Sequence, residues 1–239
     1  MPDPFLSIVV PAYNEAGRIR ETLASLCQIK ESKPYPVELI VVDDGSTDRT
    51  VETVEEFPGI RLVRNDRNHG KGYTVRHGVL EARGKLVLFT DADLSAPIEE
   101  VDKLLSALES SGADAAVGSR ALKRELIGVH QPWLRDMGGR FFNLLVKAFT
   151  GLRLHDTQCG FKLFKRSSTR HAFERMRIEG FGFDPELLFL IERGGGKVVE
   201  VPVKWNNNPA TKVRFLRDST RMFLDLIAIR WRAIIGTYQ

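Results

Sequence analysis

The sequence predicts one α/β domain in which helices cover both faces of a mostly parallel β-sheet. The first half of the chain alternates short apolar runs, rich in β-branched residues, with stretches whose apolar residues recur at helical spacing. Strands that alternate with helices of about 10–15 residues are typical of a parallel sheet in a three-layer α/β/α arrangement. The 239 residues suffice for one large core. With 43% apolar and 28% charged residues, the composition argues against a disordered chain, collagen or a coiled coil.

Five apolar runs in the first half are predicted strands, and the first of them, LSIVVP, is typical of a strand buried on both faces. These strands are expected at residues 6–11, 37–42, 61–63, 86–90 and 113–118. Helical spacing predicts helices between them, at residues 19–27, 47–56 and 72–82. We expect Gly84 to end the third helix, because glycine is common just after helices. A fourth helix is expected after Ser95 and Pro97, with the acidic residues Glu99 and Glu100 in its first turn.

The second half is less regular. It predicts helices at residues 133–150, 184–193 and 217–235, and strands at residues 159–164 and 197–205. Within the first of these helices, we expect the large apolar side chains to pack in the core: Phe141, Phe142, Leu144, Leu145 and Phe149. Polar segments at residues 122–131 and 205–212 are predicted connections within the domain.

Several classes of protein are excluded. There is no run of about 18 apolar residues, so no transmembrane helix is expected. The N-terminal residues lack the basic region of a signal peptide. The two cysteines, Cys27 and Cys159, cannot build a disulfide framework, and no Cys/His cluster indicates zinc. We therefore expect a cytoplasmic protein.

The positive charge is concentrated at the C-terminal end. The net charge is +4, and residues 212–239 contain six basic and two acidic side chains, so residues 1–211 are neutral. This asymmetry predicts a domain formed by residues 1–211 and a basic amphipathic helix within residues 212–239, with a local anionic partner. Asp225 and Arg230 interrupt the apolar residues of this helix, so it is not expected to span a bilayer. Two interpretations stay open: it lies at a membrane interface, or it packs on the domain.

Polar clusters follow three of the predicted strands. They are Pro11-Ala12-Tyr13-Asn14-Glu15, Asp43-Asp44-Gly45-Ser46 and Asp91-Ala92-Asp93. Because the carboxyl ends of parallel strands meet at one edge of a sheet, these clusters are predicted to form a ligand site there. Carboxylates two residues apart suit a hard cation, Mg²⁺ or Mn²⁺, that is shared with substrate phosphates, although they can also cap the next helix. No GxGxxG follows the first strand and no GxxxxGK[ST] is present, so a bound diphosphate is expected to rely on metal and basic side chains.

The motifs in this order resemble a known family. VVPAYNE, VVDDGSTDRT, NHGKGYTVRHG, FTDADLSAP and VGSR are similar to the inverting, family-two glycosyltransferases of GT-A (Rossmann-like) fold. In the second half, QPWLRDMGGRFFNLLV, LHDTQCGFKLF, GFGFDPELLFL and VPVKW resemble the branch of dolichyl-phosphate β-glucosyltransferases and polyprenyl-phosphate sugar synthases. The resemblance implies metal-dependent transfer of glucose from UDP-glucose to a dolichyl or polyprenyl phosphate with inversion. It also implies an enzyme bound peripherally to the inner, cytoplasmic face of a membrane.

The resemblance assigns roles to individual positions. The base and ribose of the nucleotide sugar are expected to contact Pro11, Ala12, Tyr13, Glu15, Asp43 and Asp44. Lys71 is expected to approach the nucleotide, and Asp91, Ala92 and Asp93 to bind the diphosphate, with Asp91 and Asp93 as metal ligands. Arg214 is expected to close over the diphosphate. The catalytic residues implied are Asp93, with Arg120 and Arg135 facing the acceptor phosphate. Leu94-Ser95 follows Asp93 where mannosyl relatives often have Leu-Gln, so a third metal ligand stays open.

Alternative functions remain open on the sequence. The donor could be GDP-mannose, or the acceptor could be a sugar hydroxyl, which needs a general base. Asp184 and Glu186 are candidates for that base, and equally for acids that stabilise a helix N-terminus. A nucleotidyltransferase would need a glycine-rich basic loop after the first strand, where this sequence has PAYNE. No nucleic-acid-binding motif accompanies the C-terminal arginines, so no nucleic-acid partner is expected. We expect binding to anionic vesicles, and we expect truncation after Thr211 to remove it while the core still binds UDP.

Overall fold

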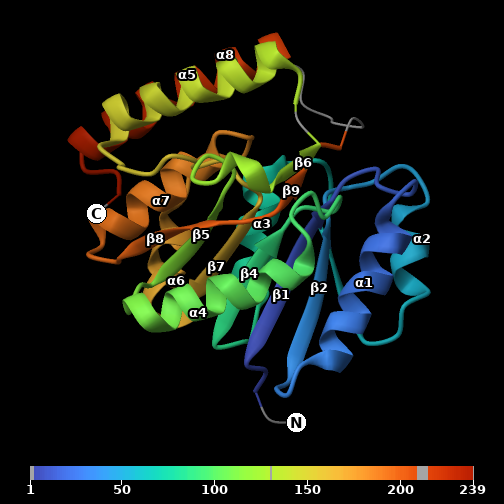
Figure 1. Ribbon diagram of the computed structural model, residues 1–239. Coiled ribbons are helices and arrows are strands. Elements are labelled where there is room, and N and C mark those ends of the chain that lie inside the picture. The colour runs from blue at the N-terminus through green and yellow to red at the C-terminus, as the bar shows by residue number, and fades with distance from the viewer. Residues whose placement is uncertain (1–2, 130, 209–214, 239) are drawn as a thin grey trace.

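The computed structural model describes residues 3–129, 131–208 and 215–238, and its centre is a seven-stranded sheet (Figure 1). The strand order is β3-β2-β1-β4-β7-β5-β8. In this sheet β7 runs antiparallel to β4 and β5, and the other neighbours pair in parallel, which confirms the mostly parallel sheet. The strands are β1 (Leu6–Ala12), β2 (Val37–Asp43), β3 (Ile60–Arg64), β4 (Leu86–Thr90), β5 (Ala115–Ser119), β7 (Phe161–Lys165) and β8 (Val198–Pro202).

A core on each face explains the nearly continuous apolar strands. Successive side chains of a strand point to opposite faces, so in β1 Val9 joins one core while Ile8 and Val10 join the other. One face is covered by α3 (Lys71–Glu81), α6 (Arg166–Arg175) and α7 (Phe183–Arg193). The other is covered by α1 (Ile19–Ser32), α2 (Thr50–Glu55) and α4 (Val101–Ser111), the last preceded by the short helix η1 (Ile98–Glu100). The predicted three-layer arrangement is confirmed.

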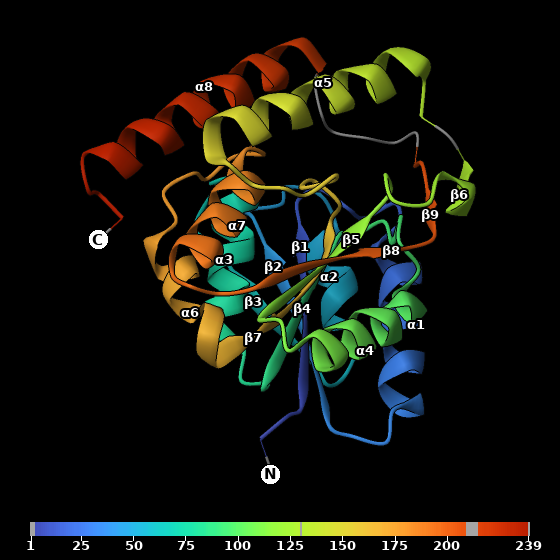
Figure 2. The ribbon, with the colours of Figure 1, turned by 60° about the vertical axis from the view of Figure 1, so that its left-hand side comes forward.

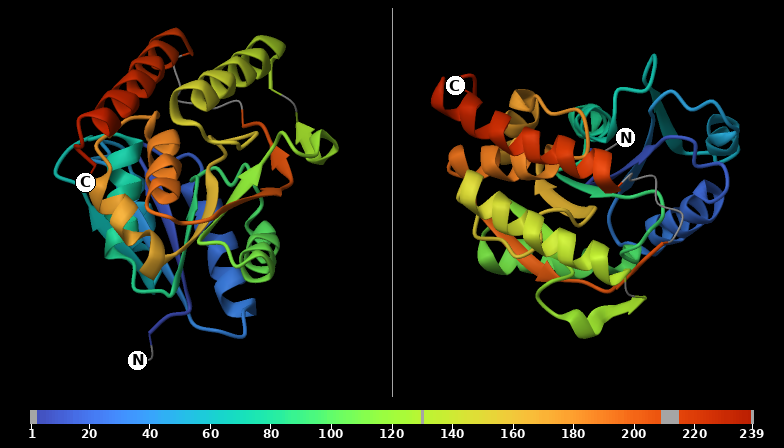
Figure 3. Two further views of the ribbon diagram at one scale, coloured as in Figure 1. Left: turned by 90° about the vertical axis from the view of Figure 1, so that its left-hand side faces the viewer. Right: turned by 90° about the horizontal axis from the view of Figure 1, so that it is seen from above.

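Two long helices lie beyond the carboxyl ends of the strands. Figures 1 and 2 show α5 (Trp133–Thr150) and α8 (Phe215–Ile234) on the side of the molecule remote from the N-terminus, and both views of Figure 3 show them side by side. Phe142 and Val146 of α5 and Leu226 and Ile229 of α8 are buried in the same core as α3 and α7. The two helices therefore form a layer over the edge of the sheet at which the sequence places its ligand site.

Some predictions of local structure were wrong. Helix α6 was not predicted, nor was a small parallel pair formed by β6 (Ile127–Val129) and β9 (Trp205–Asn206), which η2 (Arg124–Leu126) precedes. Gly84 does not end α3, because the helix ends at Glu81 and the backbone at Ala82 is already extended. Glycine is required at position 84 for another reason. A Cβ there would lie 2.6 Å from the backbone nitrogen and 2.7 Å from the hydroxyl of Ser7.

The start of α3 packs against the loop before α7 without space for a side chain at Gly72. A Cβ at this position would lie 2.5 Å from the Ile178 carbonyl oxygen and 2.6 Å from Cβ of Phe183. We expect Gly72→Ala to lower the free energy of unfolding by about 1–3 kcal/mol, as overpacking of a buried site does. Urea denaturation measures this change. Gly17→Ala is the matched control, since nothing lies within 4 Å of a Cβ there, and an equal loss in both variants would contradict the packing argument.

Candidate active site

Two cavities lie between the strand ends and the layer of α5 and α8. The first, here called the strand-end cavity, has a volume of about 850 Å³ and is bounded by the ends of β1 and β4, the start of α3 and the first half of α8. The second, here called the arginine cavity, has a volume of about 520 Å³ and lies between α5 and the segments that follow β5 and precede β7. Both volumes are in the range of small-molecule sites.

Most of the residues predicted at the donor site do meet at the strand-end cavity. It is lined by Pro11, Ala12, Tyr13, Glu15, Asp44, Lys71, Asp91, Ala92 and Asp93. Asp43 does not line it; its carboxylate is buried and accepts a hydrogen bond from the Ser46 amide. Arg214 lies outside the described residues.

The two aspartates after β4 face cationic side chains across the cavity. Asp91 Oδ1 lies 2.6 Å from Lys71 Nζ, and Asp93 Oδ2 lies 3.8 Å from a guanidinium nitrogen of Arg18. Asp93 Oδ1 accepts a hydrogen bond from the Ser95 amide at 3.0 Å. Leu94 follows Asp93 and precedes the short helix η1, and its φ is +44°. This conformation is unusual for a bulky residue and is found most often at functional sites. The backbone is therefore held in a strained turn that presents both carboxylates.

Asp44 positions the loop that carries Lys71. Its two carboxylate oxygens accept hydrogen bonds from the backbone amides of His69, at 3.0 Å, and Gly70, at 2.9 Å, and one of them also accepts from Asn65. Burial alone would lower the pKa of Lys71, but the carboxylates of Asp91 and Asp184 outweigh it and raise that pKa above its ordinary value. Lys71 is therefore a permanent cation in the wall of the strand-end cavity.

The two acids proposed as a general base lie outside both cavities. Asp184 is 4% exposed, and its Oδ1 lies 2.5 Å from Nζ of the fully buried Lys162. Glu186 is fully buried and accepts hydrogen bonds from the amides of Arg177 and Ile178 and from the Tyr238 hydroxyl. Burial raises the pKa of Asp184, although Lys162 opposes this shift. Glu186 therefore binds Tyr238 near the C-terminal end of the chain to α7. Asp184 neutralises the charge of the buried Lys162.

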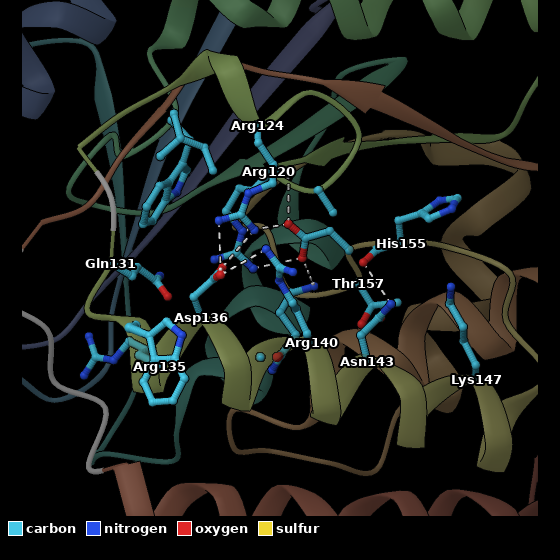
Figure 4. A pocket seen from close by; sticks show the side chains of 17 residues that line it. Arg120, Arg124, Gln131, Arg135, Asp136, Arg140, Asn143, Lys147, His155 and Thr157 are labelled. Carbon is cyan, nitrogen blue, oxygen red and sulfur yellow. Dashed lines mark hydrogen bonds and ion pairs between the residues drawn. The ribbon is translucent and has the colours of Figure 1, made fainter.

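The arginine cavity contains more cations than acids. Its lining includes four arginines and Lys147 against two aspartates. In Figure 4, Arg124, Asp136 and Arg140 lie beside Arg120, while Arg135 and Lys147 lie at the two ends of the view. Asp156 receives a bidentate ion pair from Arg120, with Nε–Oδ2 at 2.6 Å and Nη2–Oδ1 at 2.8 Å. Asp136 is paired with Arg124 at 3.1 Å and with Arg140 at 3.2 Å. Both predicted acceptor-site residues, Arg120 and Arg135, line this cavity.

Other features of this cavity are its charged ion pair and two buried polar atoms that are open to a hydrogen-bonding ligand. Burial would lower the pKa of Arg120, but the Asp156 carboxylate raises it above its ordinary value, so the guanidinium stays charged. Burial would raise the pKa of Asp156, and the Arg120 guanidinium holds it below its ordinary value instead. The hydroxyl of Thr157 and the side-chain carbonyl oxygen of Asn143 are buried at the cavity without a hydrogen-bond partner within the described part of the protein.

Sequence reasoning did not identify several residues of the two cavities. Arg18, Arg217 and Arg221 line the strand-end cavity, and Asp156 fixes Arg120 in the other. Arg217 and Arg221 belong to the basic C-terminal segment, but only the packing of α8 brings them to the strand ends. Asp156 stands in the quoted motif LHDTQCGFKLF, and a polar residue just before an apolar strand was the one signal for it.

Comparison with known sequences identifies the family. The sequence profile of glycosyl transferase family 2 matches residues 7–173, from the first strand through most of α6. The chain belongs to glycosyl transferase family 2. It is a hexosyltransferase, as expected from the sequence. Dolichyl-phosphate beta-glucosyltransferase of Saccharomyces cerevisiae is 36% identical, over 98% of this chain and 77% of that protein. The human protein of the same name is 32% identical, over 100% of this chain and 78% of its own.

Solved structures with the same fold confirm the expected GT-A architecture. Glucosyl-3-phosphoglycerate synthase from Mycobacterium tuberculosis, in complex with Mn²⁺, UDP and glucosyl-3-phosphoglycerate, superposes with a TM-score of 0.68. The match covers 95% of this chain and 78% of that one, at 21% identity. The same synthase in complex with UDP gives a TM-score of 0.67 at 22% identity, over 95% of this chain and 79% of that one. At this level of identity the likeness concerns the fold.

Proposed function

We propose that this glycosyltransferase moves glucose from UDP-glucose to a dolichyl or polyprenyl phosphate with inversion at the anomeric carbon. The main support is the arginine cavity beside the donor site: it is rich in cations, and both of its aspartates are already ion-paired. Arginine forks recognise phosphate through charge-assisted, paired hydrogen bonds. The names of the yeast and human relatives support the same donor sugar and acceptor class.

In this proposal the strand-end cavity binds UDP-glucose. Pro11, Ala12, Tyr13, Glu15 and the Asp43–Asp44 pair contact or support the base and ribose, with Asp43 acting from behind the cavity wall. Lys71 and Arg18 face the diphosphate. Arg214, which lies outside the described residues, is proposed as a further cation for the diphosphate.

We propose Asp91 and Asp93 as the residues that would hold Mg²⁺ or Mn²⁺. Their donor set fits: both are carboxylates that line the same cavity, and hard cations are commonly bound by one or two carboxylates together with substrate phosphates. Within residues 3–129, 131–208 and 215–238, no group of three or more His, Cys, Asp or Glu side chains could hold a metal ion. When bound, such an ion supplies Lewis-acid stabilisation of the leaving diphosphate.

The proposed reaction is a single displacement. An oxygen of the acceptor phosphate attacks the anomeric carbon of glucose while the bond from that carbon to the UDP oxygen breaks, and its electron pair leaves with UDP. A phosphate monoester has a second pKa of about 6, so near pH 7 it attacks without losing a proton to a base. This agrees with the position of Asp184 and Glu186 outside both cavities. Arg120 and Arg135 orient the acceptor.

The acceptor sets the location of the enzyme. A polyprenyl phosphate is confined to a membrane, so we propose that the protein acts peripherally, at the cytoplasmic membrane surface. In the described part of the chain, no helix has the length and apolar character needed to cross a bilayer.

The test measures transfer of labelled glucose from UDP-glucose to farnesyl phosphate, a short-chain acceptor used without a membrane, with and without Mn²⁺. Parallel assays use GDP-mannose as donor and 3-phosphoglycerate as a non-lipid acceptor. We expect metal-dependent transfer from UDP-glucose to farnesyl phosphate, and a larger rise of the melting temperature with UDP and Mn²⁺ than with GDP and Mn²⁺. Transfer that requires GDP-mannose, or that occurs to 3-phosphoglycerate and not to farnesyl phosphate, would contradict the proposal.

A further inference from the structure

Exposed apolar side chains are concentrated on one side of the molecule. In the described part of the chain, ten of the thirteen exposed large hydrophobic residues belong to α5 or to the stretch from Phe223 to Ile235. Several are more than half exposed, among them Phe141 at 63% and Trp231 at 62%. The expectation that Phe141 and Leu144 pack in the core was therefore wrong, while Phe142 is buried as expected. Exposed apolar residues gathered in this way mark an interaction surface.

Helix α5 has three distinct faces. One is buried in the core and includes Phe142 and Val146. A second lines the arginine cavity with Asp136, Arg140, Asn143 and Lys147, as Figure 4 shows. The third is exposed and apolar, because residues spaced by four, four and three positions share one side of a helix: Trp133, which also borders the arginine cavity, Met137, Phe141 and Leu144. The arginine cavity thus opens beside an apolar stripe.

Helix α8 repeats this arrangement over the other cavity. Its core face includes Met222, Leu226 and Ile229. A second face lines the strand-end cavity with Asp218, Arg221 and Asp225. Its third face is again exposed and apolar: Phe223, Leu224, Ile227, Trp231 and Ile234, continued by Ile235. The edge-to-face contact of Phe149 with Phe223, at 5.9 Å between ring centroids, joins the two helices.

The charge of the two helices indicates what covers these stripes. Together α5 and α8 carry seven basic and three acidic side chains, an excess of +4. Five of the basic side chains line the two cavities, and Arg230 and Arg232 lie on α8 outside them. Apolar side chains flanked by arginine and lysine, with tryptophan among them, are typical of helices that lie in the interface of an anionic bilayer. This combination favours an anionic bilayer as the partner of the two stripes.

We propose that α5 and α8 together form a membrane-docking platform, whose apolar stripes enter the headgroup region of an anionic bilayer. Both cavities then lie directly beneath the membrane, and the arginine cavity opens beside the stripe of α5, where the chain of a lipid phosphate would leave it. The proposal of a docking platform rests on the proposed function for the identity of the acceptor, but vesicle binding tests the platform without any substrate. It also extends the expected role of residues 212–239, since α5 contributes an apolar stripe as well.

The packing of α8 makes truncation of the chain an unsuitable test of this proposal. Removal of residues 212–239 would take Met222, Leu226 and Ile229 out of the core and Tyr238 away from Glu186. The truncated chain is therefore not expected to keep an intact UDP site, and substitution of exposed residues is the cleaner test.

The variants Met137→Gln with Phe141→Gln on α5, and Leu224→Gln with Ile227→Gln on α8, change exposed residues that line neither cavity. We expect each pair to weaken sedimentation with vesicles of phosphatidylcholine and phosphatidylserine at least about tenfold, since each removes two apolar anchors. Transfer to farnesyl phosphate in solution should stay within about twofold. The matched control, Met137→Leu with Phe141→Leu, keeps the apolar surface and should bind like the wild type.

A second, independent variant tests the charge. Arg230 is exposed and lines neither cavity, so Arg230→Gln should weaken binding to anionic vesicles about fivefold. Arg83→Gln, on the opposite side of the domain, is its control. The proposal is overturned if the glutamine pairs bind vesicles as the wild type does, if the wild type does not bind them, or if light scattering shows a dimer that the glutamine pairs dissociate. The last result would mean that a second copy covers the stripes. Failure of transfer to farnesyl phosphate by the wild type would instead contradict the proposed function alone.

Discussion

Asp93→Asn is expected to lose glucose transfer by about a thousandfold or more, while the fold is kept. The proposed metal site has two protein ligands, so loss of one carboxylate halves the charge that the protein offers to the ion. Lewis-acid stabilisation of a leaving group is worth several kcal/mol, and each 1.36 kcal/mol is about tenfold in rate. Folding should change little, because the ion pair of Asp93 with Arg18, at 3.8 Å, is partly exposed. Steady-state transfer and the Mn²⁺-dependent rise of the melting temperature with UDP measure both effects.

The control for this variant is Asp102→Asn. Asp102 is also an aspartate in an ion pair, with Lys33, but it lies on α4 and lines neither cavity. It should transfer glucose at the wild-type rate. Unchanged turnover in Asp93→Asn, or an unchanged response to Mn²⁺, would show that Asp93 is not a metal ligand.

The strands and most helices could be predicted because their signals are local. The run LSIVVP is apolar except for Ser7 because β1 is buried on both faces. The end of the strand brings PAYNE to the cavity wherever the neighbouring strands lie. Helix α6 was missed because its sequence, RSSTRHAFER, is mostly polar and only Thr169, Ala172 and Phe173 are buried. The insertion of β7 antiparallel between β4 and β5 depends on long-range pairing, which periodicity does not reveal.

The limits at the site have a similar cause. Helical spacing shows that α5 has more than one apolar stripe, but it cannot say which one meets the core, so Phe141 was assigned to packing although it is exposed. The place of Arg221 at the strand-end cavity follows from the packing of α8, and that of Asp156 from a fold that brings it to Arg120, 36 positions away in the sequence. Contacts between segments that are distant in the sequence leave no periodic pattern. Residues such as Arg221 and Asp156 were therefore identified only from the structure.

Arg120 shows why the acceptor site needs a careful choice of variant. The Arg120→Ala change would remove the partner of Asp156, whose side chain is buried, and an unpaired buried charge costs about 3–5 kcal/mol. A loss of activity would then report unfolding as much as acceptor binding. Arg120→Lys keeps a cation beside Asp156 but loses the bidentate pair with Asp156 and the guanidinium N–H groups that this pair leaves for the acceptor. It should therefore stay folded and bind the acceptor more weakly.

Arg135→Ala is the cleaner variant, and it carries the second large effect that we expect. Arg135 lines the arginine cavity, and a hydrogen bond to a charged group contributes about 1.5–3 kcal/mol. Its loss should raise the KM for farnesyl phosphate by roughly 10- to 150-fold, because each 1.4 kcal/mol is a factor of ten. The affinity for UDP, measured by calorimetry, should not change, since Arg135 is absent from the strand-end cavity. If UDP binding weakens and the KM for the acceptor does not move, then the arginine cavity is not the acceptor site, and the phosphate must instead meet the cations of the strand-end cavity, Arg18, Lys71 and Arg221.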